Sequence, residues 1–135
     1  MKLILMKRAL LIVIGLLLTL LINGCVRSME VDIDDLLSSP QSYQGEEICT
    51  EGVYASGFEI NALGASTYQR GDAVYLTEPV IWLERAEIRS STDCFSSTTT
   101  PPVEFCKVTV CGLFEFGANY GHVGAYDYQL RGANY

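Results

Sequence analysis

The sequence predicts an all-β domain with one short N-terminal helix. Apolar and polar residues alternate along 46–55 and again along 103–116, the pattern of half-buried strands. Glycine, proline and small polar residues divide the remaining chain into short segments. Helical spacing of apolar residues occurs over 31–40 only. Together these observations indicate short strands joined by turns.

The helix is expected between Val31 and Pro40. Asp32 or Asp34 can cap its free amide groups, and Pro40 ends it. One face is apolar at helical spacing and carries Ile33, Leu36 and Leu37. Tyr43 and Gly45 then form a turn before the first strand.

The first half of the domain should contain two strands and a third, interrupted one. Glu46 to Ala55 is the first, Gly57 breaks it, and Phe58 to Leu63 is its partner. Residues 64–72 are expected to form a polar loop. Residues 73–76 and 80–83 form a third extended stretch, interrupted at Glu78-Pro79 because proline cannot donate to a sheet. We expect Trp82 in the core.

The second half has a different composition. Residues 89–102 are rich in serine and threonine and end in two prolines, which predicts an exposed loop. Residues 103–116 are the strongest strand, 117–124 form a turn-rich segment with the single histidine, and 125–135 are the last strand. Five strands favour a small closed or nearly closed barrel, because closure removes exposed edges.

The N-terminus is typical of an exported protein. Lys2, Lys7 and Arg8 precede an apolar run of 14 residues that ends at Ile22, whereas a membrane-spanning helix needs about 20. Ile22-Asn23-Gly24-Cys25 resembles the lipobox of bacterial lipoproteins, with Asn23 in place of a smaller residue. The resemblance implies cleavage after Gly24 and acyl chains, such as palmitate, on Cys25.

These features divide the chain into three parts: a signal peptide over 1–24, a lipidated tether over 25–30 and the barrel domain over 31–135. Several acyl chains anchor a protein stably where one is marginal. Val26 follows the cysteine where an inner-membrane retention signal would have Asp. The expected location is therefore the bacterial envelope, lipid-anchored at the outer membrane and facing the periplasm.

Charge excludes one class of partner. The whole chain has a formal charge of -7, and without residues 1–24 there remain 6 basic and 16 acidic residues, a charge of -10. No basic stripe offsets this charge locally. A phosphate backbone would be repelled, so we expect no nucleic-acid partner.

The cysteine count is consistent with the envelope. Once Cys25 carries lipid, four of the five cysteines remain, in a compartment that permits disulfides. Four cysteines allow three connectivities. The expected strands favour Cys49 with Cys111, both facing outward, and Cys94 with Cys106. A zinc site of these thiols with His122 would need a second close cysteine pair, so no metal is expected.

The domain also resembles a family of small, uncharacterised bacterial proteins with an OB-like barrel. The matching residues span about 31–130 and are Asp35-Leu36, Pro40, Tyr43, Gly45, Phe58-Glu59, Leu63, Ile81-Trp82-Leu83, Gly112, Phe114 and Gly121-His122-Val123-Gly124. The resemblance implies a five-stranded Greek-key barrel with adjacent first and fourth strands, as a Cys49 to Cys111 bond requires. It implies no activity.

No arrangement of residues predicts a reaction or a cofactor. No serine or cysteine lies in a nucleophile elbow, and neighbouring carboxylates on a strand point to opposite faces. The candidate binding residues are Phe58, Glu59, Tyr120 and His122, although His122 between glycines can equally be a turn residue. OB-like domains bind oligosaccharides on aromatic faces. Such faces are offered by Tyr54, Tyr68, Tyr75, Tyr120, Tyr126 and Tyr128, unless these tyrosines only fill the barrel.

The sequence thus predicts a membrane-anchored, non-enzymatic binding or scaffold module for an envelope protein or saccharide. An inhibitor or immunity-type lipoprotein that blocks a hydrolase is the alternative. Small size, disulfides, acidity and surface anchoring suit both functions. The sequence does not specify an oligomeric state.

Overall fold

The computed structural model describes residues 28–132. The expected signal peptide, Cys25 and residues 133–135 lie outside this range. The elements in chain order are β1 (Met29–Glu30), α2 (Ile33–Ser38), η1 (Pro40–Ser42), β2 (Glu47–Gly57), β3 (Ile60–Gly64), β4 (Thr67–Arg70), β5 (Ala73–Leu76), β6 (Ile81–Glu84), β7 (Glu87–Ser96), β8 (Glu104–Tyr120), η2 (His122–Gly124) and β9 (Tyr126–Arg131). The fold is mostly β with little helix, as the sequence predicts.

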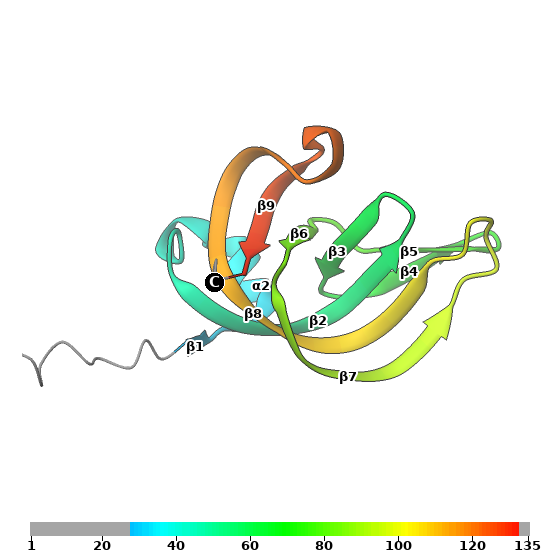
Figure 1. Ribbon diagram of the computed structural model, residues 1–135, viewed down its shortest axis with the longest axis horizontal. Helices are drawn as coiled ribbons and strands as arrows, with labels where there is room; N and C mark the ends of the chain where they lie inside the picture. Colours follow the sequence, from blue (N-terminus) through cyan, green and yellow to red (C-terminus); the bar gives the residue numbers. More distant parts are fainter. Residues whose placement is uncertain (1–27, 133–135) are drawn as a thin grey trace, which may run out of the picture.

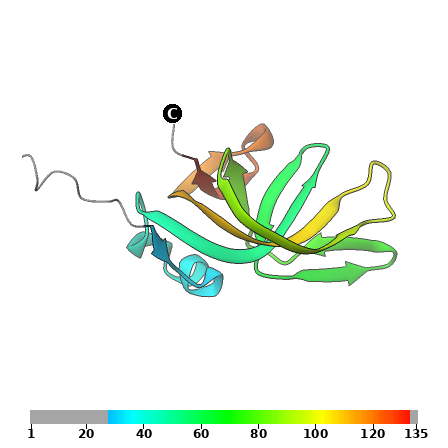
Figure 2. The same cartoon turned by 60° about the horizontal axis from the view of Figure 1, so that its bottom comes forward.

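Five strands pair in a closed ring, in the order β2, β3, β6, β9, β8 and back to β2. The main sheet has the order β1-β2-β3-β6-β9-β8-β7, and an additional β2–β8 pairing joins strands that the order separates. Within the ring only β6 and β9 run parallel; the other pairs are antiparallel. Strands β2 and β8 curve strongly and lie along each other in both views (Figures 1 and 2).

The N-terminal helix follows the sequence pattern closely. Asp32 caps α2 by accepting a hydrogen bond from the Asp34 amide at 2.8 Å. Ile33 and Leu36 are buried against the strands of the ring. This core includes Ile48, Leu63, Ile81, Val110, Phe114 and Leu130. The helix therefore closes one end of the apolar interior.

Two polar segments predicted as loops contain strands. Residues 64–72 contain β4, which pairs with β5 in a separate hairpin, and the expected third extended stretch is divided between β5 and β6. Residues 89–102 lie mostly in β7, which pairs with β8 along one edge. All ten residues of β7 are exposed. Because neither face of β7 is buried, its sequence lacks the alternation by which strands are recognised.

Two burial predictions were wrong. Trp82 is only half-buried and is not among the buried core residues. Its ring packs against Tyr126, with 5.1 Å between the ring centroids. Cys49 and Cys111 do not face outward to solvent, since they are 3% and 4% exposed. The N-terminal segment covers them: β1 pairs with β2, and Ser28 Oγ lies 3.2 Å from Cys49 Sγ.

The structure contains both disulfides that the expected strands favoured, Cys49–Cys111 and Cys94–Cys106. Cys49 and Cys111 occupy opposite positions of the β2–β8 pair. The second bond joins exposed Cys94 of β7 to buried Cys106 of β8. The two bonds differ in the length of chain they close, with sequence separations of 62 and 12.

Loss of the buried disulfide should be the more damaging. In the chain-entropy model the longer loop is worth about 4 kcal/mol and the shorter about 3 kcal/mol. We therefore expect Cys49→Ala/Cys111→Ala to lower the free energy of unfolding more than Cys94→Ala/Cys106→Ala. Urea unfolding of the two double variants measures the difference, and equal losses would contradict the expectation.

An ion pair joins the interior of β8 to the last residue of β9. Arg131 donates to both carboxylate oxygens of Glu115 at 3.2 Å, and Gln129 donates to the same carboxylate at 2.6 Å. The hydrogen bond from Arg131, followed by that from Gln129, holds the pKa of Glu115 below its usual value. The carboxylate is mostly covered, with 22% of the Glu115 side chain exposed.

This pair should make stability sensitive to acid. A group with a lowered folded-state pKa stabilises the protein above its unfolded pKa, about 4.3 for Glu, and this contribution is lost as pH falls through the folded pKa. Glu115→Gln should therefore flatten the fall of unfolding free energy below about pH 4.3. The control is Glu46→Gln, which removes an exposed carboxylate outside any ion pair of residues 28–132. An unchanged acid profile for Glu115→Gln would contradict the assignment.

Candidate functional site

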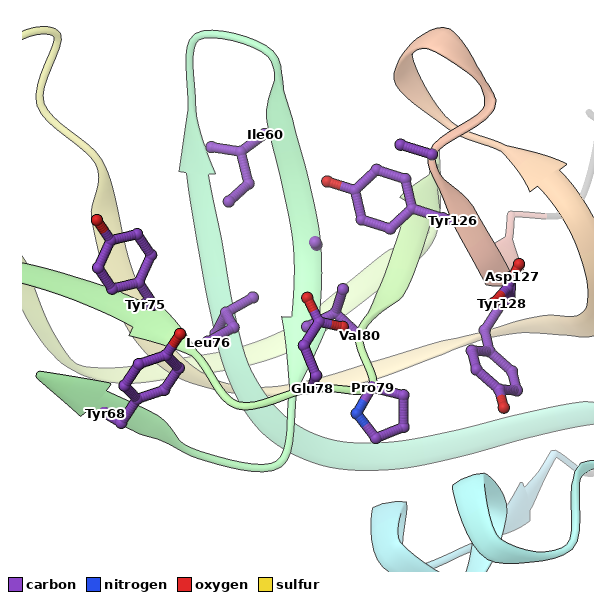
Figure 3. Close-up of a pocket in the computed structure, with 12 residues that line it drawn as sticks. Ile60, Tyr68, Tyr75, Leu76, Glu78, Pro79, Val80, Tyr126, Asp127 and Tyr128 are labelled. Carbon is purple, nitrogen blue, oxygen red and sulfur yellow. The ribbon is translucent and has the colours of Figure 1, made fainter. Parts of the chain in front are cut away.

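A groove of about 340 Å³ lies between the β4–β5 hairpin and the ring. Tyrosines stand on both sides of it, as Figure 3 shows. Its lining comes from β3, from β4 and β5, from the segment before β6, and from β9: Ile60, Ala62, Tyr68, Tyr75, Leu76, Glu78, Pro79, Val80, Ala125, Tyr126, Asp127 and Tyr128. Segments far apart in the sequence thus form one concave surface.

The hairpin supplies two of the aromatic faces. Tyr68 of β4 and Tyr75 of β5 occupy opposite register positions, and their rings stack with centroids 5.5 Å apart. Both side chains remain about half exposed. Adjacent cross-strand positions bring such rings into contact. The stacked pair therefore presents a preformed aromatic face beside the groove.

Strand β9 supplies the opposite aromatic side. Tyr126 and Tyr128 lie two positions apart along β9, with Asp127 between them. In Figure 3 the Tyr126 ring points toward the groove, and Asp127 is turned to the other side of the strand. The ring of Tyr128 stacks on Phe114 of the core, with 6.3 Å between the ring centroids.

The groove is acidic. Its lining includes Glu78 and Asp127 and contains no Lys, Arg or His. Burial raises the pKa of the Tyr126 phenol, and the negative charge of Glu78 raises it further. In Figure 3 the Glu78 side chain stands between Tyr126 and the Tyr68–Tyr75 pair. The carboxylate therefore acts electrostatically on Tyr126.

A polar contact joins two loop tips beside the groove. His122 Nε2, at the start of η2, lies 3.5 Å from Glu59 Oε1 in the β2–β3 turn. Phe58 and Val123, next to this pair, are 73% and 84% exposed. Glu59 and Val123 both have positive φ, at 62° and 51°. Such a conformation is rare for a β-branched residue and is often found at functional sites.

The sequence-predicted binding residues are thus partly brought together. Phe58, Glu59 and His122 gather at the loop tips, and Tyr120 ends β8 just before them. None of the four lines the groove itself, although Ile60 and Tyr126 connect the two regions. Tyr54 serves the structure instead, because its hydroxyl lies 2.6 Å from Asn61 Oδ1.

Sequence reasoning missed the role of Gly121. Its φ of 67° and ψ of -159° are accessible essentially to glycine alone. A Cβ atom there would lie 2.6 Å from Trp82 and 2.7 Å from Tyr126. The glycine therefore lets the η2 turn pack on both rings. The signal in the sequence was Gly121-His122-Val123-Gly124 itself, with two glycines around the turn.

Sulfur and carboxylate ligands gather at one place in the described chain. Cys94, Glu104 and Cys106 have ligand atoms within 4.8 Å of one another. Both sulfurs belong to a disulfide, and the thiolate is the form that binds metal. The group therefore cannot offer two thiolates while the bond is intact.

Comparisons with protein-family models, curated proteins and solved structures gave no match. Within residues 28–132, no helix has the length and apolar character needed to cross a membrane.

Gly121→Ala should loosen the η2 turn and destabilise the domain by about 1–3 kcal/mol, the usual cost of strained backbone. Gly71→Ala is the matched control, because Gly71 also has positive φ but nothing lies within 4 Å of its added Cβ. The fluorescence of Trp82, the sole tryptophan, should change in the first variant only. Identical losses of unfolding free energy and unchanged fluorescence in both would contradict the packing role.

Proposed function

We propose that this chain is a lipid-anchored, non-enzymatic module of the bacterial envelope that binds a saccharide in the groove between β4–β5 and β9. The observation that carries the proposal is the pair of tyrosine walls, Tyr68–Tyr75 on one side and Tyr126 on the other. Aromatic rings offer rigid apolar faces with polar tips, which suit the apolar faces and hydroxyls of sugars.

We further propose that the closed ring is an OB-like Greek-key barrel. In that arrangement β2, β3, β6, β8 and β9 are its five strands, and the pairing order and the parallel β6–β9 pair support the assignment. OB-folds bind oligosaccharides or oligonucleotides on strands 2 and 3 and through two loops. Here these would be β3, β6 and the turns that carry Glu59 and His122. This support is an analogy between folds.

Charge favours saccharide over nucleic acid. The charge of -10 beyond residue 24 and the acidic lining would repel a polyphosphate. A neutral or cationic sugar carries no such penalty. Sugars attached to the cell envelope are also within reach of a domain that begins three residues after Cys25.

The tether supports close anchoring. Ser28 and β1 are already part of the fold, since Ser28 contacts Cys49 and the Val31 amide donates to the Cys49 carbonyl at 2.9 Å. Three peptide units join Cys25 to Ser28, which allows about 11 Å between their Cα atoms. If Cys25 is acylated, the domain is held near the lipid surface.

Exposed apolar loop tips favour the inhibitor or immunity-type alternative. Phe58 and Val123 offer the exposed side chains that a bound protein would cover. Phe58→Ser with Val123→Ser should abolish capture of a hydrolase and leave saccharide binding intact if both functions exist. Inhibition of a purified cell-wall hydrolase by the unchanged protein, lost in this variant, would favour the alternative.

Tyr75→Ala should weaken binding of a tetramer of N-acetylglucosamine about tenfold, because it removes one stacked aromatic wall. Phe95→Ala is the matched control: Phe95 is also 46% exposed and stacks on another ring, Phe105, but lies outside the groove. Titration followed by Trp82 fluorescence measures both. Absence of binding by the unchanged protein to a panel of envelope saccharides would overturn the proposal.

A further inference from the structure

We propose that the groove selects a sugar bearing a free ammonium group over its N-acetylated counterpart. This inference rests on the proposed saccharide function and names the chemistry of the ligand. Three observations carry it: the placement of Glu78, the tyrosine rings around it and the distribution of positive charge in the domain.

Glu78 is a carboxylate without a cationic partner in the described chain. Four of the five Lys and Arg residues in 28–132 form ion pairs elsewhere: Arg85 with Glu84, Arg89 with Glu87, Lys107 with Asp93 and Arg131 with Glu115. The fifth, Arg70, is not part of the groove lining. No Lys or Arg of residues 28–132 therefore compensates the negative charge in the groove.

The rings around Glu78 favour a cation as well. A positive group over the face of a tyrosine is attracted by the ring quadrupole. Tyr68, Tyr75 and Tyr126 lie on two sides of Glu78 (Figure 3), and the groove is lined by these rings together with the carboxylate. The carboxylate can pair with the charge of an ammonium group, and the aromatic faces can contact the apolar carbons next to it.

The electrostatic state of the groove agrees with this geometry. Glu78 already perturbs Tyr126, whose pKa is raised first by burial and then by that charge. A bound ammonium would oppose the effect of the Glu78 charge on that pKa. An N-acetyl group is neutral and larger, so it gains neither the ion pair nor the cation–π contact.

The test compares tetramers of glucosamine and of N-acetylglucosamine at a mildly acidic pH that protonates the free amine. The full chain should bind the glucosamine tetramer about tenfold more tightly. Glu78→Gln should remove this preference and retain binding of the acetylated tetramer. Glu46→Gln makes the same charge change outside the groove and should keep the preference.

Every other outcome overturns either the ammonium inference or the proposed saccharide function. Equal affinity for the two tetramers would overturn the ammonium inference and leave the saccharide function standing. Loss of the preference in both Glu variants would mean nonspecific attraction to an acidic protein and would also overturn the inference. Tighter binding of tetralysine than of either sugar would overturn the amino-sugar assignment. Failure of both tetramers and of the wider saccharide panel would overturn the proposed function itself.

Discussion

The pairing of β2 with β8 is the constraint on which the rest of the structure depends. It runs from Glu47 opposite Leu113 to Ser56 opposite Glu104, and the Cys49–Cys111 bond lies within it. It joins residues that are 48 to 66 positions apart in the sequence, so it carries a large entropy cost of loop closure. The covalent bond reduces that cost by limiting the unfolded chain. Strand β8 also pairs with β7 and β9.

The sequence predicts those parts of the fold that bury one face. The strands now assigned as β2 and β8, and the Asp32-capped helix, were recognisable because each has buried apolar residues among exposed or partly exposed ones. Strands β4 and β7 were not, because their side chains are largely exposed and burial therefore leaves no apolar pattern in their sequences. The burial of Cys49 was not predictable either, since it depends on the N-terminal segment that covers it.

The residue types of the candidate site could be predicted from the sequence, but the position at which they come together could not. The tyrosines and the Glu59 and His122 side chains were singled out by their chemistry. Which of them gather is decided by the parallel β6–β9 pairing and by the separate β4–β5 hairpin. A parallel pair needs a long crossover connection, and here that connection includes β7 and β8. Local sequence patterns carry no information on such a crossover.

The contacts that hold the ring of strands together also position the wall of the groove. Trp82 of β6 lies against Tyr126 of β9, and the Gly121 turn packs on both rings. The indole N–H donates to Glu84 at 3.1 Å, which fixes the ring from the opposite end. The orientation of Tyr126 is therefore set by the same contacts that hold β6 beside β9. A binding wall built on paired strands is positioned more accurately than one on a loop. The β4–β5 hairpin pairs with no strand of the main sheet and is held to it by the packing of Leu76 on Ala55, Ala62 and Phe105, so any adjustment to a ligand should occur there.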